Sequence, residues 1–130
     1  MGETILIVDD EPFNVDLLEQ ELGDLGYETL TAFDGQQAVD AVRKHRPDLV
    51  LLDVMMPVMD GFTACRLLKE DEETRLIPII IMTALDRVED RIQGIEAGAD
   101  DFLTKPVNDR ELLARIQTAL KMKAAFDQKV

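Results

Sequence analysis

The sequence predicts an α/β protein in which helices cover both faces of a parallel sheet. Short apolar runs alternate with helix-like segments five times along the 130 residues, and such alternation is typical of right-handed strand–helix–strand crossovers in a three-layer sandwich. Three of the apolar runs are almost continuous Ile, Leu and Val, as expected for strands buried on both faces of a parallel sheet. The sequence contains no internal repeat, which excludes a solenoid.

Five runs are expected to be the strands. The first, third and fourth ("TILIV", "DLVLL" and "IPIIIM") are the most apolar. The second ("YETLTA") alternates apolar and polar residues and therefore fits an edge of the sheet. In order, with "DFLT" as the fifth, the runs span 4–8, 27–32, 48–52, 77–82 and 101–104.

The first helix is expected to begin at Pro12, because a proline fits the first turn of a helix. Gly26 is expected to end this helix. An apolar stripe should face the core, and it consists of Phe13, Leu17, Leu18, Leu22 and Leu25.

Similar signals mark the other four helices. Pro47 bounds the second helix, Gly61 precedes the third, and Gly98 ends the fourth. The fifth helix is expected to begin near Asn108, with an inward face of Leu112, Leu113, Ile116 and Leu120.

Length, charge and cysteine content narrow the functional classes. The 130 residues suffice for one domain with a hydrophobic core. The net charge of −13 argues against nucleic acid as a direct partner, because phosphate backbones are bound by Lys and Arg. The single cysteine, Cys65, excludes a disulfide framework and favours a reducing compartment. Because the sequence has neither a signal peptide nor an apolar run of membrane-spanning length, it predicts a cytoplasmic protein without a membrane partner.

Polar side chains stand at the carboxyl ends of the predicted strands, where ligands bind in open parallel sheets. If the first and third strands are neighbours, their ends lie about 5 Å apart. Two carboxylates at that separation repel by roughly 3 kcal/mol at an effective dielectric constant of ~20. Three acids beside one lysine therefore require a proton or a bound cation. The polar residues are, in chain order, Asp9, Asp10, Asp53, Thr83 and Lys105.

The predicted cation is Mg²⁺, with Mn²⁺ as the alternative, because the candidate ligands are all hard oxygen atoms. Mg²⁺ held by few carboxylates keeps positions open for water and for a phosphate oxygen. Asp53 then has a possible role as a nucleophile toward phosphorus. Thr83 and Lys105 are candidates to hold the other phosphoryl oxygens by hydrogen bond and charge.

Four motifs, in order at the strand ends, resemble those of the receiver domain of two-component response regulators. They are "ILIVDDE", "LVLLDVMMPVMDG", "IIMTA" and "FLTKP", and the resemblance covers about residues 3–121. It implies a flavodoxin-like (βα)5 fold with strand order 2-1-3-4-5. It also implies a receiver domain over 1–121, with 122–130 extending the last helix toward an output domain or a dimer partner. The stretch "TALDRVEDRIQGIEAGADDFLTKP" is most similar to receivers attached to diguanylate cyclases or sensor kinases.

The resemblance assigns chemistry to the acids. Asp53 would accept a phosphoryl group from the phosphohistidine of a sensor histidine kinase or of a phosphotransfer protein. Asp10 and Asp53 would bind Mg²⁺ together with the backbone carbonyl of Met55, and Asp9 would assist largely through water. On this reading the domain is not an enzyme with a separate substrate, because it catalyses only its own phosphorylation and dephosphorylation.

The same resemblance implies how phosphorylation is transmitted. Thr83 would bind the phosphoryl group, Lys105 would pair with its oxygens, and Phe102 would swing inward. The peptide bond between Lys105 and Pro106 is expected to be cis. The face formed by the fourth helix, the fifth strand and the fifth helix would then change, with a homodimer as one possible outcome.

Structural alternatives exist for the individual site residues. Asp9 and Asp10 are also compatible with a solvated strand end that caps the first helix. Thr83 is also compatible with a helix cap, and Phe102 with an ordinary core position.

Two other functions remain open beside the receiver. A Mg²⁺-dependent phosphohydrolase with an aspartyl intermediate usually carries its two acids two residues apart after the first strand, whereas here they are adjacent. An adaptor that keeps the fold without being phosphorylated would not need the complete set of site residues.

Two further expectations concern the phosphoryl group. Met55 and Leu85 occupy positions that, in this family, can orient the attacking water, and neither side chain hydrogen-bonds water well. The resemblance therefore predicts a comparatively long-lived aspartyl phosphate. His45 is the only histidine, so the phosphodonor must be another protein or domain.

Overall fold

Ten regular elements alternate along the chain. The computed structural model describes residues 2–84 and 87–128, with side chains up to Ala125. The strands are β1 (Thr4–Val8), β2 (Glu28–Ala32), β3 (Leu49–Asp53), β4 (Ile79–Thr83) and β5 (Asp101–Thr104). The helices are α1 (Pro12–Asp24), α2 (Gly35–His45), α3 (Gly61–Glu70), α4 (Val88–Glu96) and α5 (Asp109–Gln128).

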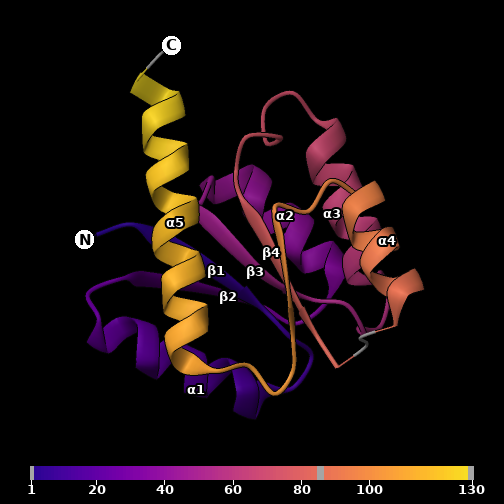
Figure 1. The fold of residues 1–130 in the computed structure, drawn as a ribbon, viewed down its shortest axis with the longest axis horizontal. Coiled ribbons are helices and arrows are strands. Elements are labelled where there is room, and N and C mark those ends of the chain that lie inside the picture. The colour runs from indigo at the N-terminus through magenta and orange to yellow at the C-terminus, as the bar shows by residue number, and fades with distance from the viewer. Residues whose placement is uncertain (1, 85–86, 129–130) are drawn as a thin grey trace.

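The five strands form one parallel sheet in the order β2-β1-β3-β4-β5. Helices α1 and α5 cover one face of this sheet, and α2, α3 and α4 cover the other (Figure 1). The predicted α/β three-layer sandwich with flavodoxin-like strand order is therefore confirmed, including the edge position of β2. Each helix in the described part of the chain is too short or too polar to be a membrane span.

The three central strands supply both halves of the core, because successive residues of a strand point to opposite faces. Burying one such aliphatic side chain stabilises the fold by about 1.5–3 kcal/mol. The set that packs with α2 and α3 is Leu6, Val8, Val50, Leu52, Ile79 and Ile81. The set that packs with α1 and α5 is Ile5, Ile7, Leu49, Leu51, Ile80 and Met82.

The predicted apolar stripe of α1 is only partly correct. Val15 and Leu22 are buried against the sheet, and Leu18 packs beside them. Phe13 and Leu25, which were expected to face the core, are 69% and 45% exposed. Leu17 is exposed as well. The residues at 15, 18 and 22 follow the spacing of one helix face, so the inward side of α1 is rotated away from the predicted one.

Helix α5 agrees with the sequence expectation except at Leu113, which is half-buried and is not among the residues that pack on the core. The side chain of Asn108 caps it by accepting hydrogen bonds from the backbone N–H groups of Arg110 and Glu111. Leu112 and Ile116 are buried in the core. The helix continues to Gln128 and extends beyond the end of the sheet (Figure 1).

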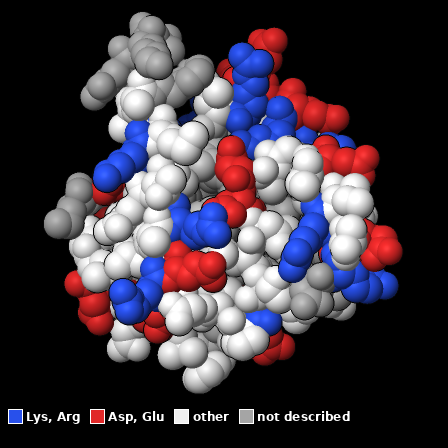
Figure 2. All heavy atoms as spheres, viewed as in Figure 1, with Lys and Arg blue, Asp and Glu red and all other residues white. Residues whose placement is uncertain are grey.

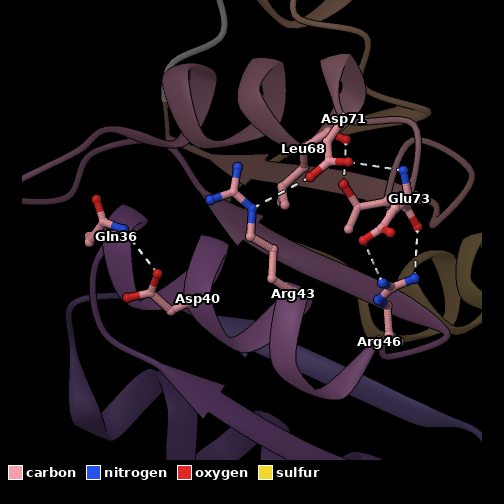
Figure 3. A network of polar contacts seen from close by, with 8 residues as sticks. Gln36, Asp40, Arg43, Arg46, Leu68, Asp71 and Glu73 are labelled. Atoms are coloured by element: carbon pink, nitrogen blue, oxygen red, sulfur yellow. Dashed lines mark hydrogen bonds and ion pairs between the residues drawn. The ribbon is translucent and has the colours of Figure 1, made fainter.

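Polar contacts join the end of α2 to the segment that connects α3 with β4 (Figure 3). The guanidinium group of Arg46 donates to the backbone oxygen and to Oε2 of Glu73, at 3.2 and 2.8 Å. Arg43 pairs with Asp71 at 3.6 Å. These pairs are about half exposed, so each contributes at most about 1 kcal/mol.

A less exposed ammonium group ties α3 to the starts of β4 and β5. Nζ of Lys69 donates to the backbone oxygens of Arg75 and Ile77 at 2.9 and 2.8 Å. It also pairs with Oδ2 of Asp100 at 2.7 Å. These contacts fix the end of the sheet that is opposite to the carboxyl ends of the strands.

Figure 2 shows the face that carries α4 and α5, where acidic and basic side chains are interspersed. Arg115, for example, pairs with Asp101 at 3.2 Å and with Glu111 at 3.8 Å. The net charge of −13 is therefore not gathered into a single acidic patch on this face.

Candidate functional site

The strand register brings three acids together at the carboxyl end of the sheet. Val8 is paired with Leu52 across β1 and β3, so Asp9 and Asp10 emerge beside Asp53, the last residue of β3. One carboxylate oxygen from each acid lies within 4.8 Å of the others. Asp9 and Asp53 are only 1% and 7% exposed, whereas Asp10 is exposed.

Asp9 is held by donors on both of its oxygens. Its Oδ1 accepts a hydrogen bond from the backbone N–H of Glu11 at 3.0 Å. Its Oδ2 accepts from Nζ of Lys105 at 3.0 Å and from Nδ2 of Asn14 at 3.4 Å. The N-cap residue of α1 is Glu11, so the alternative in which Asp9 or Asp10 caps that helix is wrong.

Lys105 stands between two of the acids. Its Nζ is 3.0 Å from Oδ2 of Asp9 and 3.7 Å from Oδ2 of Asp53. Its backbone N–H donates to the carbonyl of Thr83 at 2.7 Å, which fixes the end of β5 against the end of β4. The predicted cis peptide bond between Lys105 and Pro106 is present.

The environment of Asp53 disfavours its ionised form. Burial raises the pKa of the Asp53 carboxyl above its ordinary value, the Lys105 ammonium acts in the opposite direction, and Asp9 and Asp10 add to the increase. Oδ1 of Asp53 accepts from the backbone N–H of Val54 at 2.8 Å. A cation beside this carboxylate would offset both the repulsion and the burial.

Gly61 allows the segment after β3 to fold back on the site. Its backbone N–H donates to the carbonyl of Val54 at 2.9 Å. A Cβ atom at position 61 would collide with the carbonyl of Asp53 and lie 2.8 Å from Cα of Val54. Asp60 caps α3 by accepting from the backbone N–H of Thr63 at 2.8 Å. The sequence marked Gly61 only as a helix boundary, whereas the structure places it directly beneath Asp53.

The exposed part of the same segment includes Met55 and Val58. Met55 is exposed, and its backbone carbonyl as a metal ligand stays a prediction. Val58 has a φ of +70° and is 82% exposed, a conformation that is unusual for a β-branched residue. Leu85, the second residue expected near an attacking water, lies outside the described residues.

Thr83 and Phe102 lie on the two strands nearest to α4. Thr83 is fully buried at the end of β4. The N-cap residue of α4 is Arg87, so the alternative in which Thr83 caps that helix is wrong. The half-buried ring of Phe102 packs beneath Gly94 of α4, where an added Cβ would lie 3.0 Å from Cδ2 of the ring.

The structure thus brings together Asp9, Asp10, Asp53 and Lys105, as the strand-end argument predicted. Sequence reasoning missed Asn14, which contacts Asp9 from the first turn of α1. The available signal was its position five residues after Asp9 on a helix that begins beside the acids.

A family model for the response regulator receiver domain matches residues 5–117. Among curated proteins, the response regulator PleD of Caulobacter vibrioides is 52% identical over 128 residues. The match covers 98% of this chain and 28% of PleD, so the chain spans less than a third of that relative.

Solved receiver structures are similar in fold and sequence. The receiver domain of the sensor histidine kinase PA1611 from Pseudomonas aeruginosa, with a magnesium ion coordinated in its active site cleft, is 37% identical with a TM-score of 0.86. That match covers 93% of this chain and 99% of the other. The BeF3-activated N-terminal receiver domain of Klebsiella pneumoniae RstA is 34% identical with a TM-score of 0.84, over 91% and 98% of the two chains. This chain therefore belongs to the receiver domains of two-component response regulators.

Proposed function

We propose that Asp53 accepts a phosphoryl group from a phosphohistidine of a sensor histidine kinase or of a phosphotransfer protein. The observation that carries this proposal is the position of the Asp53 carboxylate, with two other acids and Lys105 at the end of the sheet. The donor histidine must come from another protein or domain, because the sequence has a single histidine, His45, and it ends α2 near the amino ends of the strands, away from the acids.

Mg²⁺ fits the acid cluster. Three carboxylate oxygens within 4.8 Å of one another form a hard ligand set, and one lysine does not balance three negative charges. Asp10 and Asp53 would hold the ion with the Met55 carbonyl, and Asp9 would act largely through water. Mn²⁺ suits the same donors. When bound, the ion supplies positive charge beside the phosphoryl oxygens.

The chain's own residues account for the transfer step. An oxygen of Asp53 attacks phosphorus, the new O–P bond replaces the P–N bond of the donor, and the imidazole leaves. Oδ1 is held by the Val54 N–H group, so we assign the attack to Oδ2. Lys105 shifts from Asp9 toward the phosphoryl oxygens, and the Thr83 hydroxyl group donates a hydrogen bond to one of them.

A partner surface lies next to the acids. A cleft of about 340 Å³ between α1 and the start of α5 is lined by Asp9, Lys105 and the apolar side chains of Leu17 and Leu18. Phe13 is exposed on the same helix. We propose that the phosphodonor protein docks here, because exposed apolar residues beside a reactive carboxylate suit a protein partner.

The signal would leave through the face formed by α4, β5 and α5. Binding of Thr83 to the phosphoryl group would free space for the Phe102 ring, which packs under Gly94 of α4. The exposed side chains of Val88, Ile92 and Ile95 follow one another at helical spacing on α4. We propose this stripe as the contact for a second copy or for an output domain.

The remaining assignments complete the proposal. Residues 1–121 form the receiver, and 122–130 lead toward a following domain or a dimer partner; of this last segment, 122–128 continue α5 and 129–130 lie outside the described residues. The domain acts in the cytoplasm and catalyses only its own phosphorylation and dephosphorylation. Buried Cys65, whose thiol pKa is raised to about 11 by burial, stays protonated and takes no part.

Intact-mass analysis after incubation with acetyl phosphate and Mg²⁺ tests the function. The wild-type chain should gain one phosphoryl adduct, and Asp53→Asn should gain none. EDTA should abolish the adduct if a divalent cation is needed. A folded wild-type chain that binds Mg²⁺ without becoming labelled would contradict the proposal and favour the adaptor.

The persistence of the adduct is a separate question. Met55→Asn places a side chain that can orient water near the phosphoryl group, so the adduct should decay faster than in the wild type. Following the loss of the adduct over time by mass spectrometry measures this, and equal decay rates would remove the role assigned to Met55.

A further inference from the structure

Oδ2 of Asp9 is a shared acceptor. It receives both the Lys105 ammonium group at 3.0 Å and the Asn14 amide at 3.4 Å. Asn14 is the third residue of α1, and its short side chain reaches back to the acid from the first turn of that helix. Because Asp9 is 1% exposed, the loss of a donor from its carboxylate is costly.

The Lys105 ammonium group cannot stay paired with Asp9 while it binds a phosphoryl group on Asp53. Its Nζ is 3.0 Å from Asp9 and 3.7 Å from Asp53 in the structure. In the function proposed above, on which this inference rests, the ammonium group moves toward the phosphoryl oxygens on Asp53. Asp9 then loses its charged partner, and the side-chain donor that remains on Oδ2, among the described contacts, is Asn14.

We propose that Asn14 is a positioning residue for phosphoryl transfer, which holds Asp9 in place when Lys105 moves to the phosphoryl group. An amide suits this role because it donates a hydrogen bond without adding charge to the acid cluster. A cationic side chain at position 14 would compete with Lys105, and a carboxylate would add to the repulsion among the acids. The effect of Asn14 is therefore specific to the phosphorylated state.

Beryllofluoride, which activates the RstA receiver named above, provides a stable probe of that state. Calorimetry would measure the affinity of the chain for Mg²⁺ alone and for beryllofluoride in the presence of Mg²⁺. Asn14→Leu removes the donor and keeps the branched shape of the side chain. It should weaken beryllofluoride binding about tenfold, equivalent to about 1.4 kcal/mol, and should leave Mg²⁺ affinity within about twofold, because Lys105 still holds Asp9 in the resting state.

Two further variants separate positioning from a general structural role. Gln20→Leu changes an exposed polar residue of the same helix and should leave both affinities unchanged. Asn14→Gln keeps an amide donor and should recover part of the beryllofluoride affinity. The melting temperature of Asn14→Leu, measured without either ligand, shows whether the fold is intact.

The outcomes are distinct. If Asn14→Leu weakens Mg²⁺ and beryllofluoride binding equally, or weakens neither, Asn14 has no state-specific role and the inference is overturned. If the wild-type chain itself fails to bind beryllofluoride, the proposed function fails first. State-specific weakening that Asn14→Gln reverses would support the assignment.

Discussion

Replacing Asp53 by Asn should stabilise this receiver when no divalent cation is present. Asp53 is 7% exposed, and its carboxylate lies beside two other acids. Burial and the neighbouring acids raise the pKa of Asp53, which means that the folded state disfavours its charge. Asparagine keeps the shape of the side chain and removes that charge.

The distances give the size of the effect. At an effective dielectric constant of ~20, Lys105 at 3.7 Å attracts the Asp53 carboxylate by roughly 4.5 kcal/mol. Asp9, within 4.8 Å, repels it by about 3.5 kcal/mol or more. The attraction by Lys105 and the repulsion by Asp9 largely cancel, especially since Lys105 is shared with Asp9. The cost of burying the Asp53 charge therefore remains. We expect Asp53→Asn to be more stable by about 2 kcal/mol, or roughly 7 °C in melting temperature.

The gain in stability from Asp53→Asn should depend on pH. In the unfolded chain an Asp has a pKa of about 3.9, and the folded pKa of Asp53 is higher. As pH rises through the interval between these values, the unfolded chain releases its proton first, so wild-type stability falls. The advantage of Asp53→Asn should be complete above the folded pKa and absent below the unfolded one.

Thermal unfolding of both proteins in EDTA, from about pH 3 to pH 8, measures the difference directly. Asp16→Asn is the matched control, because Asp16 is exposed on α1 and its neutralisation should change little. An Asp53→Asn variant that melts at or below the wild-type temperature at pH 7 would refute the electrostatic argument.

Three further substitutions test other parts of the fold. Gly94→Ala should stabilise the chain more in a Phe102→Leu background than in the wild type, because the added Cβ lies 3.0 Å from the Phe102 ring. We expect a coupling of about 1 kcal/mol in a double-mutant cycle measured by urea unfolding. Equal effects in both backgrounds would disprove the contact. Val58→Gly should stabilise the fold by about 1 kcal/mol in the same assay, because glycine adopts a φ of +70° without strain. Val58→Ala keeps the Cβ atom and should therefore stabilise the fold much less. Lys69→Met should destabilise the fold by about 2–4 kcal/mol in thermal unfolding, because two backbone oxygens and the Asp100 carboxylate lose their donor. The control is Arg43→Met, which removes a half-exposed ion pair. A loss of stability no larger than that of Arg43→Met would contradict the prediction.

The sequence was a good guide to the sheet and to the acids of the site, and the reason is local. A strand buried on both faces must be apolar along its whole length, so the residue at which polarity returns marks its carboxyl end. Asp9 and Asp53 are such residues. Parallel strands bring those ends to one edge, and the predicted strand order then placed them together.

Sequence alone was a poorer guide to features that depend on how helices dock. The apolar residues of α1 fit more than one stripe, and the contact with the sheet selects Val15 and Leu22 over Phe13. The ion pair of Lys69 with Asp100 joins residues 31 positions apart, at the end of α3 and just before β5. The position of Asn14 five residues after Asp9 made a contact possible, but whether it forms depends on the angle at which α1 leaves the site.

The length of α5 has a mechanical consequence. Its 20 residues make a rod of about 30 Å. The rod begins near Lys105, packs on the sheet at Ile116 and Leu120, and extends past the sheet at its far end (Figure 1). A rotation of about 10° around the end near Lys105 would displace the far end by about 5 Å. A change in the direction of α5 beside the acids would therefore be enlarged at the end of the helix that extends past the sheet.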